Sequence, residues 1–208
     1  TFARKPGADI LLRREDVRER DINRTCMLHA GSVSLSDEPC RDAIGYAMSL
    51  AHEKGKMVSF DVNYRDMIWH DRERCKKEIE TILPYVDFLK ISDEELYFVG
   101  DREQIPAFME RYGITVLVET LGSKGARYFY KGNSGVIEGR KVKAVDATGA
   151  GDAFWGGFLS KLLMSGVKCT EDVTEDKVKE ALAYGNASGA LCVQKQGGIP
   201  ALPTRREI

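Results

Sequence analysis

Residues 145–163 read VDATGAGDAFWGGFLSKLL and join a glycine-rich turn to the start of a helix. Small residues fill positions 149–151, Asp152 follows them, and apolar residues then recur at helical spacing, at Phe154, Phe158 and Leu162. The first N–H groups of a helix lack intrahelical partners, and the helix dipole is positive at that end. Small side chains there let a large anion approach the backbone. The stretch therefore predicts an anion-binding helix start with a carboxylate beside it.

Two roles are open to Asp152. A carboxylate repels a bound phosphate, so its position makes chemical sense when it acts on a third group. In phosphoryl transfer an aspartate can accept the proton of the substrate hydroxyl while other donors stabilise the transferring group. The alternative is an ordinary first-turn acid that the helix dipole favours, beside glycines that only form a tight turn. Residues 149–152 alone leave both roles open.

Other phosphate-binding motifs do not match. The sequence has no G-x-x-x-x-G-K-[ST] motif, and a dinucleotide-type G-x-G-x-x-G starting at Gly149 fails because Phe154 occupies its last position. GSKG at 122–125 has the spacing of an RNA-binding G-x-x-G loop. The formal net charge of −1 does not favour such a ligand. We therefore expect no nucleic-acid partner.

Composition indicates one globular domain over residues 1–208. Of the 208 residues 43% are hydrophobic and 30% charged, which allows a sizeable core. No apolar run approaches the length of about 18 residues that spans a bilayer, so no membrane partner is expected. Five scattered cysteines predict neither a disulfide framework nor a C-x-x-C metal site (Cys26, Cys40, Cys75, Cys169 and Cys192). A reducing cytoplasm is the expected location.

Strand-like and helical segments alternate through the first 120 residues, which indicates βα units around a parallel sheet. The predicted strands are Thr25–Ala30, Met57–Val62, Val86–Ile91 and Ile114–Glu119. The predicted helices run from Pro39 to about Gly55, over Asp71–Leu83 and over Arg102–Tyr112. A hairpin and a long final helix complete the chain, at Ala126–Tyr130 with Val136–Glu138 and at Glu175–Val193.

Polar or glycine-rich residues follow each predicted strand. They read HAGS (29–32), DVNYR (61–65), SDEE (92–95) and TLGSKG (120–125). Ligands of parallel α/β sheets bind beyond the carboxyl ends of the strands, so these segments and residues 149–152 are expected to line one cleft. His29 is expected to be a packed strand-end residue, since no second ligand lies at metal-binding spacing. Trp155 and Phe158 are expected in the core.

DATGAGDAF (146–154) resembles the signature of the ribokinase, or PfkB-type, family of carbohydrate kinases, usually D-T-x-G-A-G-D, with Ala147 where threonine is commoner. Further segments resemble the fructokinase-like branch in order and spacing: FDVNYR (60–65) with MIW after it, KISDEEL (90–96), TLGSKGARYF (120–129) and ALPT (201–204). The resemblance covers essentially the whole chain. It implies a ribokinase-like α/β fold, with a mainly parallel sheet flanked by helices on both faces.

The resemblance also implies roles for single residues. Asp152 would take the proton of the sugar hydroxyl, and the anion hole for the γ-phosphate would comprise Gly149, Ala150 and Gly151. Asn63 and Arg65 would lie on the sugar side of the cleft. The nucleotide-binding residues would be Ser92, Glu95, Thr120, Leu121, Gly122, Ser123, Lys124, Gly125 and Asn186.

Two metal sites are implied in the same way. Glu95 would hold magnesium through water, although Ser92 replaces the asparagine of the family's N-x-x-E motif. A monovalent cation such as potassium would lie near Asp146, Thr148, Cys192, Lys195 and Gly197. Without the resemblance, Glu95 would be an ordinary solvated acid, and Arg65 would be open to an ion pair with Asp61 or Asp66.

Family members usually have a further segment before the position that matches Thr1. It carries the first strands of the sheet, much of the sugar-contacting surface and a β lid that often forms a dimer contact. Thr1-Phe2-Ala3-Arg4 reads as if it lay inside a strand, and the first residue is not Met. We therefore expect this chain to be the carboxyl-terminal two-thirds of the family pattern, without those strands and lid, and the full-length protein to be a homodimer.

The leading hypothesis is ATP- and magnesium-dependent phosphorylation of a primary hydroxyl of a sugar, with fructose as the expected acceptor. The alternative acceptors are 2-keto-3-deoxygluconate, which DVNYR (61–65) suits equally, another sugar or a nucleoside. An alternative of another class is a non-catalytic nucleotide or sugar sensor of the same fold. Asp152 argues against the sensor, because a protein that only binds has no need of a base.

Overall fold

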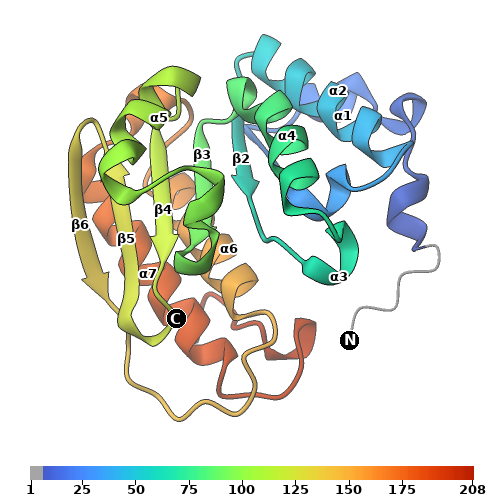
Figure 1. Ribbon diagram of the computed structural model, residues 1–208. Helices are drawn as coiled ribbons and strands as arrows, with labels where there is room; N and C mark the ends of the chain where they lie inside the picture. Colours follow the sequence, from blue (N-terminus) through green and yellow to red (C-terminus); the bar gives the residue numbers. More distant parts are fainter. Residues whose placement is uncertain (1–6) are drawn as a thin grey trace. The chain divides into compact units, whose positions relative to one another are not determined.

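Six β-strands are hydrogen-bonded in the order β1-β2-β3-β4-β5-β6 in the computed structural model, which describes residues 7–208 (Figure 1). Helices flank this mixed sheet, as predicted. The described chain divides into two compact units after Leu117, unit 1 and unit 2. The single domain over residues 1–208 stays a prediction. The strand expected around Thr1-Phe2-Ala3-Arg4 lies outside the described residues.

Unit 1 contains parallel strands whose carboxyl ends lie side by side. They are β1 (Met27–Gly31), β2 (Met57–Asp61) and β3 (Phe88–Ser92). The register pairs Gly31 with Asp61, and Asp61 with Lys90. Every residue of β2 is buried, as is usual in a parallel sheet. The polar residues that follow these strands are thereby brought to one edge.

The predicted strands exist, but three of them begin two residues later than predicted, and near the starts of two of them, β1 and β3, a side chain takes the place of a ladder bond. The three strands are β1, β3 and β4 (Val116–Thr120). Thr25 Oγ1 donates to Met27 O at 2.8 Å and accepts from Met27 N at 3.2 Å. Asp87 Oδ2 accepts from Val58 N at 2.8 Å.

Within its described residues, unit 1 contains five α-helices, and two of them, α4 (Arg72–Ile82) and α5 (Ile105–Tyr112), follow capping signals of the sequence. The other three are α1 (Glu19–Asn23), α2 (Cys40–Glu53) and α3 (Asp66–Trp69). Asp71 caps α4 by accepting from Arg74 N at 3.0 Å. α5 ends at Gly113, whose φ of 73° suits glycine. The prediction that this helix begins at Arg102 is wrong, because a separate 3₁₀ turn precedes it and Pro106 occupies its first turn.

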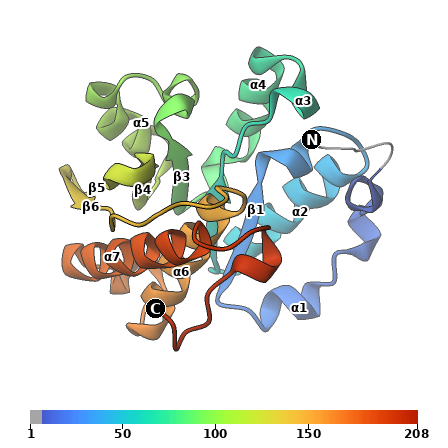
Figure 2. The same ribbon diagram turned by 90° about the horizontal axis from the view of Figure 1, so that it is seen from below.

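Unit 2 combines an antiparallel hairpin with two long helices. β5 (Gly125–Tyr130) pairs with β6 (Asn133–Glu138), and the helices are α6 (Ala150–Met164) and α7 (Glu175–Cys192). α6 and α7 lie side by side and approach closely at small residues (Figure 2). A Cβ atom at Gly157 would lie 2.4 Å from Ser188 Oγ, so glycine is needed there. Trp155 and Phe158 are buried, which confirms them as core residues.

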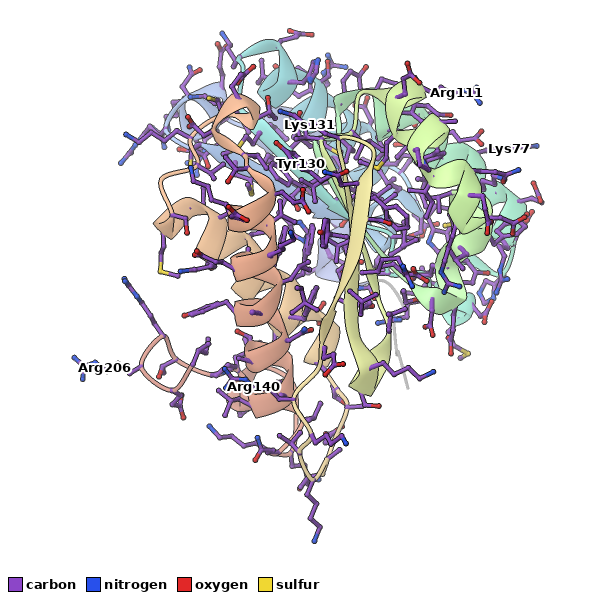
Figure 3. The ribbon with its side chains drawn as sticks, turned by 90° about the vertical axis from the view of Figure 1, so that its left-hand side faces the viewer. Lys77, Arg111, Tyr130, Lys131, Arg140 and Arg206 are labelled. Carbon is purple, nitrogen blue, oxygen red and sulfur yellow. The ribbon has the colours of Figure 1, made fainter. Side chains whose placement is uncertain are left out.

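Glu175 fixes the start of α7 to the hairpin. Its carboxylate accepts from Tyr128 Oη at 2.6 Å and from Asn133 Nδ2 at 2.8 Å, and it pairs with Lys179 Nζ at 2.8 Å. Lys179, together with the tyrosine and asparagine donors, lowers the pKa of Glu175 to about 2. Figure 3 shows Tyr130 and Lys131 at the turn of this hairpin and Arg140 near its opposite end. Glu175 therefore anchors the hairpin near its turn, where β6 begins.

Other expectations concern the whole chain. All five cysteines are free in the structure (Cys26, Cys40, Cys75, Cys169 and Cys192). Among the described residues, no helix combines the length and the apolar character that a bilayer crossing requires.

Candidate active site

The ends of β1, β2 and β3 form a polar edge in unit 1. Lys90 Nζ donates to both carboxylate oxygens of Asp61 at 2.8 Å, and both side chains are buried. Asp61 is therefore paired with Lys90, and the ion pair considered between Asp61 and Arg65 is wrong. His29 is exposed rather than packed, and its Nδ1 lies 3.1 Å from Ser59 Oγ.

The segment 62–65 leads from β2 to α3 and contains Asn63 and Arg65, the two residues predicted to contact the sugar. Val62 N donates to Lys90 O at 3.0 Å, which continues the ladder by one residue. Asn63 then has a φ of 39°, in the left-handed region that asparagine tolerates better than most residues. Tyr64 N donates to Glu95 Oε1 at 2.6 Å. Arg65 is exposed at the start of α3, so its guanidinium is accessible to a ligand.

Glu95 is a buried residue, and the expectation of a solvated acid is wrong. Only 7% of it is exposed. Oε1 accepts from Tyr64 N, and Oε2 accepts from Ser92 N at 2.7 Å. The second contact is the glutamate half of a capping box, in which the third helical residue reaches back to the N-cap N–H. Glu95 thus joins the loop after β2 to the loop after β3.

These residues fit the implied magnesium site poorly. Both oxygens of Glu95 accept hydrogen bonds from backbone N–H groups, and only 7% of the residue is exposed. Among residues 7–208 no cluster of three or more His, Cys, Asp or Glu side chains could hold a metal ion. Ser92 is half-buried at the N-cap of the following 3₁₀ turn. We therefore derive no step through a metal held by Glu95.

Unit 2 contains a cavity of about 820 Å³. Its lining includes most of the predicted nucleotide and anion residues, namely Thr120, Gly122, Ser123, Lys124, Gly125, Ala150, Gly151 and Asn186. Leu121, Gly149 and Asp152 are not part of the lining. Segments that lie far apart in the sequence are thereby brought together in one concave site.

The start of α6 presents free backbone donors. Gly149 is the N-cap, with a φ of 77°, and a Cβ atom there would lie 3.2 Å from Gly198 Cα. Ala150 N donates to Ala147 O at 3.2 Å, whereas the N–H groups of Gly149, Gly151 and Asp152 donate to no other described residue. The Asp152 side chain is exposed in the first turn. This arrangement can hold an anion next to an accessible carboxylate.

Several of the residues predicted to bind a monovalent cation connect the loop before α6 to the loop after α7 by hydrogen bonds. Asp146 Oδ1 accepts from Thr148 N at 2.9 Å and from Thr148 Oγ1 at 2.7 Å, and Oδ2 accepts from Gly197 N at 2.9 Å. These donors lower the pKa of Asp146. Cys192 is buried with Sγ 3.7 Å from Thr148 O, but the Lys195 side chain pairs instead with Glu207. Four of the five residues therefore lie together.

A basic loop of residues 139–144 also lines the cavity, and it was not predicted. Gly139 N donates to Lys124 O at 3.2 Å, and Asn186 Nδ2 donates to Ile137 O at 2.9 Å and to Glu138 O at 3.1 Å. The far end is held by Val193 O, which accepts from the N–H groups of residues 145 and 146. The sequence feature that could have indicated this loop is GRKVK at 139–143, a run of basic residues directly after a predicted strand.

The basic side chains of the cavity carry uncompensated charge. Lys124, Arg140 and Lys141 line it, and none of them has an acidic partner within the part of the chain that the structure describes. The lining also includes small or apolar residues: Ala147, Phe154, Gly189, Ala190 and Val193. The cavity thus offers both apolar and basic groups to a ligand.

The cavity of this α/β fold lies next to the start of α6 and contains both apolar and basic side chains. It therefore suits a large ligand that has an apolar part and an anionic part. The chain belongs to the pfkB family of carbohydrate kinases, because the profile of this family matches residues 2–205. A probable fructokinase-5 of Arabidopsis thaliana is 41% identical over 207 residues, which cover 98% of this chain and 63% of the relative. Fructokinase-1 of Oryza sativa subsp. japonica is 36% identical over 211 residues, covering 100% and 64%. The chain thus spans less than two thirds of these relatives.

Solved structures agree with this assignment. Fructokinase from Xylella fastidiosa with bound ATP matches with a TM-score of 0.89 and 27% identity, covering 100% of this chain and 67% of that one. Fructokinase from Vibrio cholerae O395 with fructose, ADP and calcium ion matches with a TM-score of 0.86 and 30% identity, covering 99% and 66%. A double mutant of the latter is described with fructose, ADP and a potassium ion bound. The predicted ribokinase-like fold is confirmed.

Proposed function

We propose that the full-length protein transfers the γ-phosphoryl group of ATP to a primary hydroxyl of a sugar, with fructose as the preferred acceptor. The observation that carries this proposal is the cavity of unit 2, which gathers the predicted nucleotide residues against the start of α6. The fructokinases at 36% and 41% identity support the choice of sugar. Magnesium would enter with ATP, and potassium would bind near Asp146 and Thr148.

In the proposed reaction Asp152 accepts the proton of the sugar hydroxyl. The hydroxyl oxygen forms a bond to the γ-phosphorus, and the bond from that phosphorus to the β–γ bridging oxygen breaks, so that ADP leaves with the electron pair. Within the anion hole of residues 149–151, the free backbone N–H groups of Gly149 and Gly151 stabilise the charge of the transferring group. Asn63 and Arg65 contact the sugar. We further propose a cytoplasmic homodimer, although one relative is described as chloroplastic.

The test is an assay of the purified full-length protein with ATP, magnesium and a panel of acceptors. The panel contains fructose, 2-keto-3-deoxygluconate, ribose and a nucleoside, and the products are ADP and the phosphorylated acceptor, identified by mass. Fructose is expected to react fastest. ATP alone is expected to raise the melting temperature, because it binds the native state. ATP binding without turnover of any acceptor would instead support the non-catalytic sensor.

The basic side chains that line the cavity are expected to bind the phosphates of ATP. Replacing both Arg140 and Lys141 with glutamine should weaken ATP binding by about three- to tenfold, since each exposed charge pair contributes up to about 1 kcal/mol. Binding should also become less sensitive to salt. The measurement is calorimetry with ATP and adenosine, and only ATP should lose affinity.

A double variant with the same change of charge provides the control. Arg205 and Arg206 are exposed in unit 2 outside the cavity lining, and Figure 3 shows Arg206 on a different segment from Arg140. Glutamine at both positions should leave the affinity for ATP unchanged. An equal loss for ATP and adenosine would contradict contact with the phosphates and would place the basic loop against the base or ribose.

A further inference from the structure

Glu95 occupies a central place between two loops of unit 1. Its carboxylate accepts from Tyr64 N at 2.6 Å and from Ser92 N at 2.7 Å while only 7% of the residue is exposed. We propose that Glu95 is a positioning residue that fixes the sugar-contacting segment 63–65, rather than a ligand of magnesium. This inference rests on the function proposed above, because it assumes that Asn63 and Arg65 contact the acceptor.

The N–H group that Glu95 binds belongs to Tyr64, the middle residue of the segment 63–65. Tyr64 separates Asn63 from Arg65, so a fixed Tyr64 backbone sets the directions of both neighbouring side chains. The Tyr64 ring also packs against Phe98, with ring centroids 5.4 Å apart. Phe98 belongs to the same 3₁₀ turn as Glu95. Backbone and ring of Tyr64 are therefore both held by this turn.

The segment needs an external support, because its own conformation is not a favoured one. Asn63 has a φ of 39°, which most residues with a side chain avoid. The ladder of β2 ends with the bond from Val62 N to Lys90 O. Beyond that bond, the Glu95 carboxylate is the next acceptor for a backbone N–H of the segment. Loss of this acceptor would leave Asn63 and Tyr64 free to relax.

A carboxylate suits this task better than a neutral side chain. Hydrogen bonds from N–H groups to an ionised acceptor are shorter and stronger than neutral ones, in agreement with the two distances. A glutamine at this position offers one oxygen and one NH₂ group, so it must face one of the two N–H groups with a donor. Alanine removes both acceptors. The two substitutions should therefore form a graded series.

The experiment measures equilibrium binding of fructose to the full-length protein in buffer without nucleotide and without magnesium. Glu95→Gln should weaken fructose binding about tenfold, the lower end of the effect of one hydrogen bond to a charged group, and Glu95→Ala should weaken it further. In the assay, KM for fructose should rise while the magnesium concentration that gives half-maximal rate stays unchanged. Circular dichroism and the melting temperature verify folding.

Glu94→Gln is the matched control. Glu94 neighbours Glu95 on the same turn, is exposed, and has no hydrogen-bond partner among the described residues. Its replacement removes the same charge and should change neither fructose affinity nor KM. Amide hydrogen exchange adds a readout that does not depend on activity, since exchange at Tyr64 N should accelerate in Glu95→Ala and not in Glu94→Gln.

Two results would overturn the inference. One is a folded Glu95→Ala variant that retains fructose affinity without metal but needs more magnesium for turnover, as a metal ligand would. The other is unchanged exchange at Tyr64 N. Failure of the proposed function is distinguishable, because it would appear in the unsubstituted protein as no binding and no phosphorylation of any acceptor on the panel.

Discussion

Replacing Asp152 with asparagine is expected to lower the turnover of fructose by about two to four orders of magnitude, the usual contribution of a general base. Asparagine keeps the size of the side chain but cannot accept the hydroxyl proton. Because Asp152 is exposed in the first turn of α6, the fold should not change. ATP affinity should be retained or slightly increased, since a carboxylate and a triphosphate repel each other. Steady-state assays and calorimetry measure both quantities.

Asp176→Asn is the matched control for this variant. Asp176 is also an exposed first-turn acid, at the start of α7, and it lies outside the cavity lining. Its replacement should leave turnover unchanged. If Asp152→Asn also turned over fructose at the rate of the unsubstituted protein, Asp152 would be an ordinary first-turn acid and another residue would have to accept the proton.

Replacing Gly125 with alanine is expected to destabilise unit 2 by about 3 kcal/mol or more, through backbone strain and overpacking. Gly125 has a φ of 102°, and a Cβ atom there would lie 2.1 Å from Ile137 O and 2.5 Å from Gly139 N. Both neighbours are backbone atoms at the base of the basic loop, so they cannot rotate away. The melting temperature should fall by about 6–12 °C, and ATP binding should be lost.

Gly122→Ala is the control that separates backbone strain from overpacking. Gly122 lies on the same loop with a φ of 57°, but a Cβ atom there would have no neighbour within 4 Å. The variant should therefore show only the cost of the left-handed conformation, about 1 kcal/mol. Equal losses of stability in the two variants would mean that the packing of Gly125 against β6 does not determine the stability of this loop.

Hydrophobic patterning predicted the strands and long helices well, because burial of one face imposes a period on the sequence. The hairpin was found at β5 and β6, and the end of α5 at Gly113. Strand starts were less predictable, since the side chains of Thr25 and Asp87 satisfy backbone groups in place of the ladder. Hydrogen bonds of this kind, in which a side chain replaces a backbone partner, cannot be recognised from the pattern of apolar residues.

The candidate site was partly predictable. The Ser92-x-x-Glu95 spacing is a capping-box signature, so the contact between these two residues could have been expected from the sequence. The contact of Glu95 with Tyr64, 31 positions away, depends on which strands are neighbours and could not. The same holds for Asp61 and Lys90, whose pairing follows from the register of β2 and β3.

The cavity illustrates a further limit of sequence reasoning. Residues 120–125 and Asn186 were predicted as parts of one site, and all of them except Leu121 line one cavity. The basic loop of residues 139–144 was missed because it has no periodic pattern. Its position depends on Asn186 holding the end of β6, which only the fold reveals.

In the proposed reaction, nucleotide binding and the positioning of the sugar depend on residues that are encoded by different parts of the gene. The cavity is lined by residues of unit 2 alone, and the contacts of Glu95 with Tyr64 and Ser92 belong to unit 1 alone. If the proposed function holds, mutations that change the acceptor sugar can accumulate in the codons of unit 1 while those for the cavity of unit 2 stay intact. Under the same proposal, recombination near codon 117 would join the existing cavity of unit 2 to a new choice of sugar.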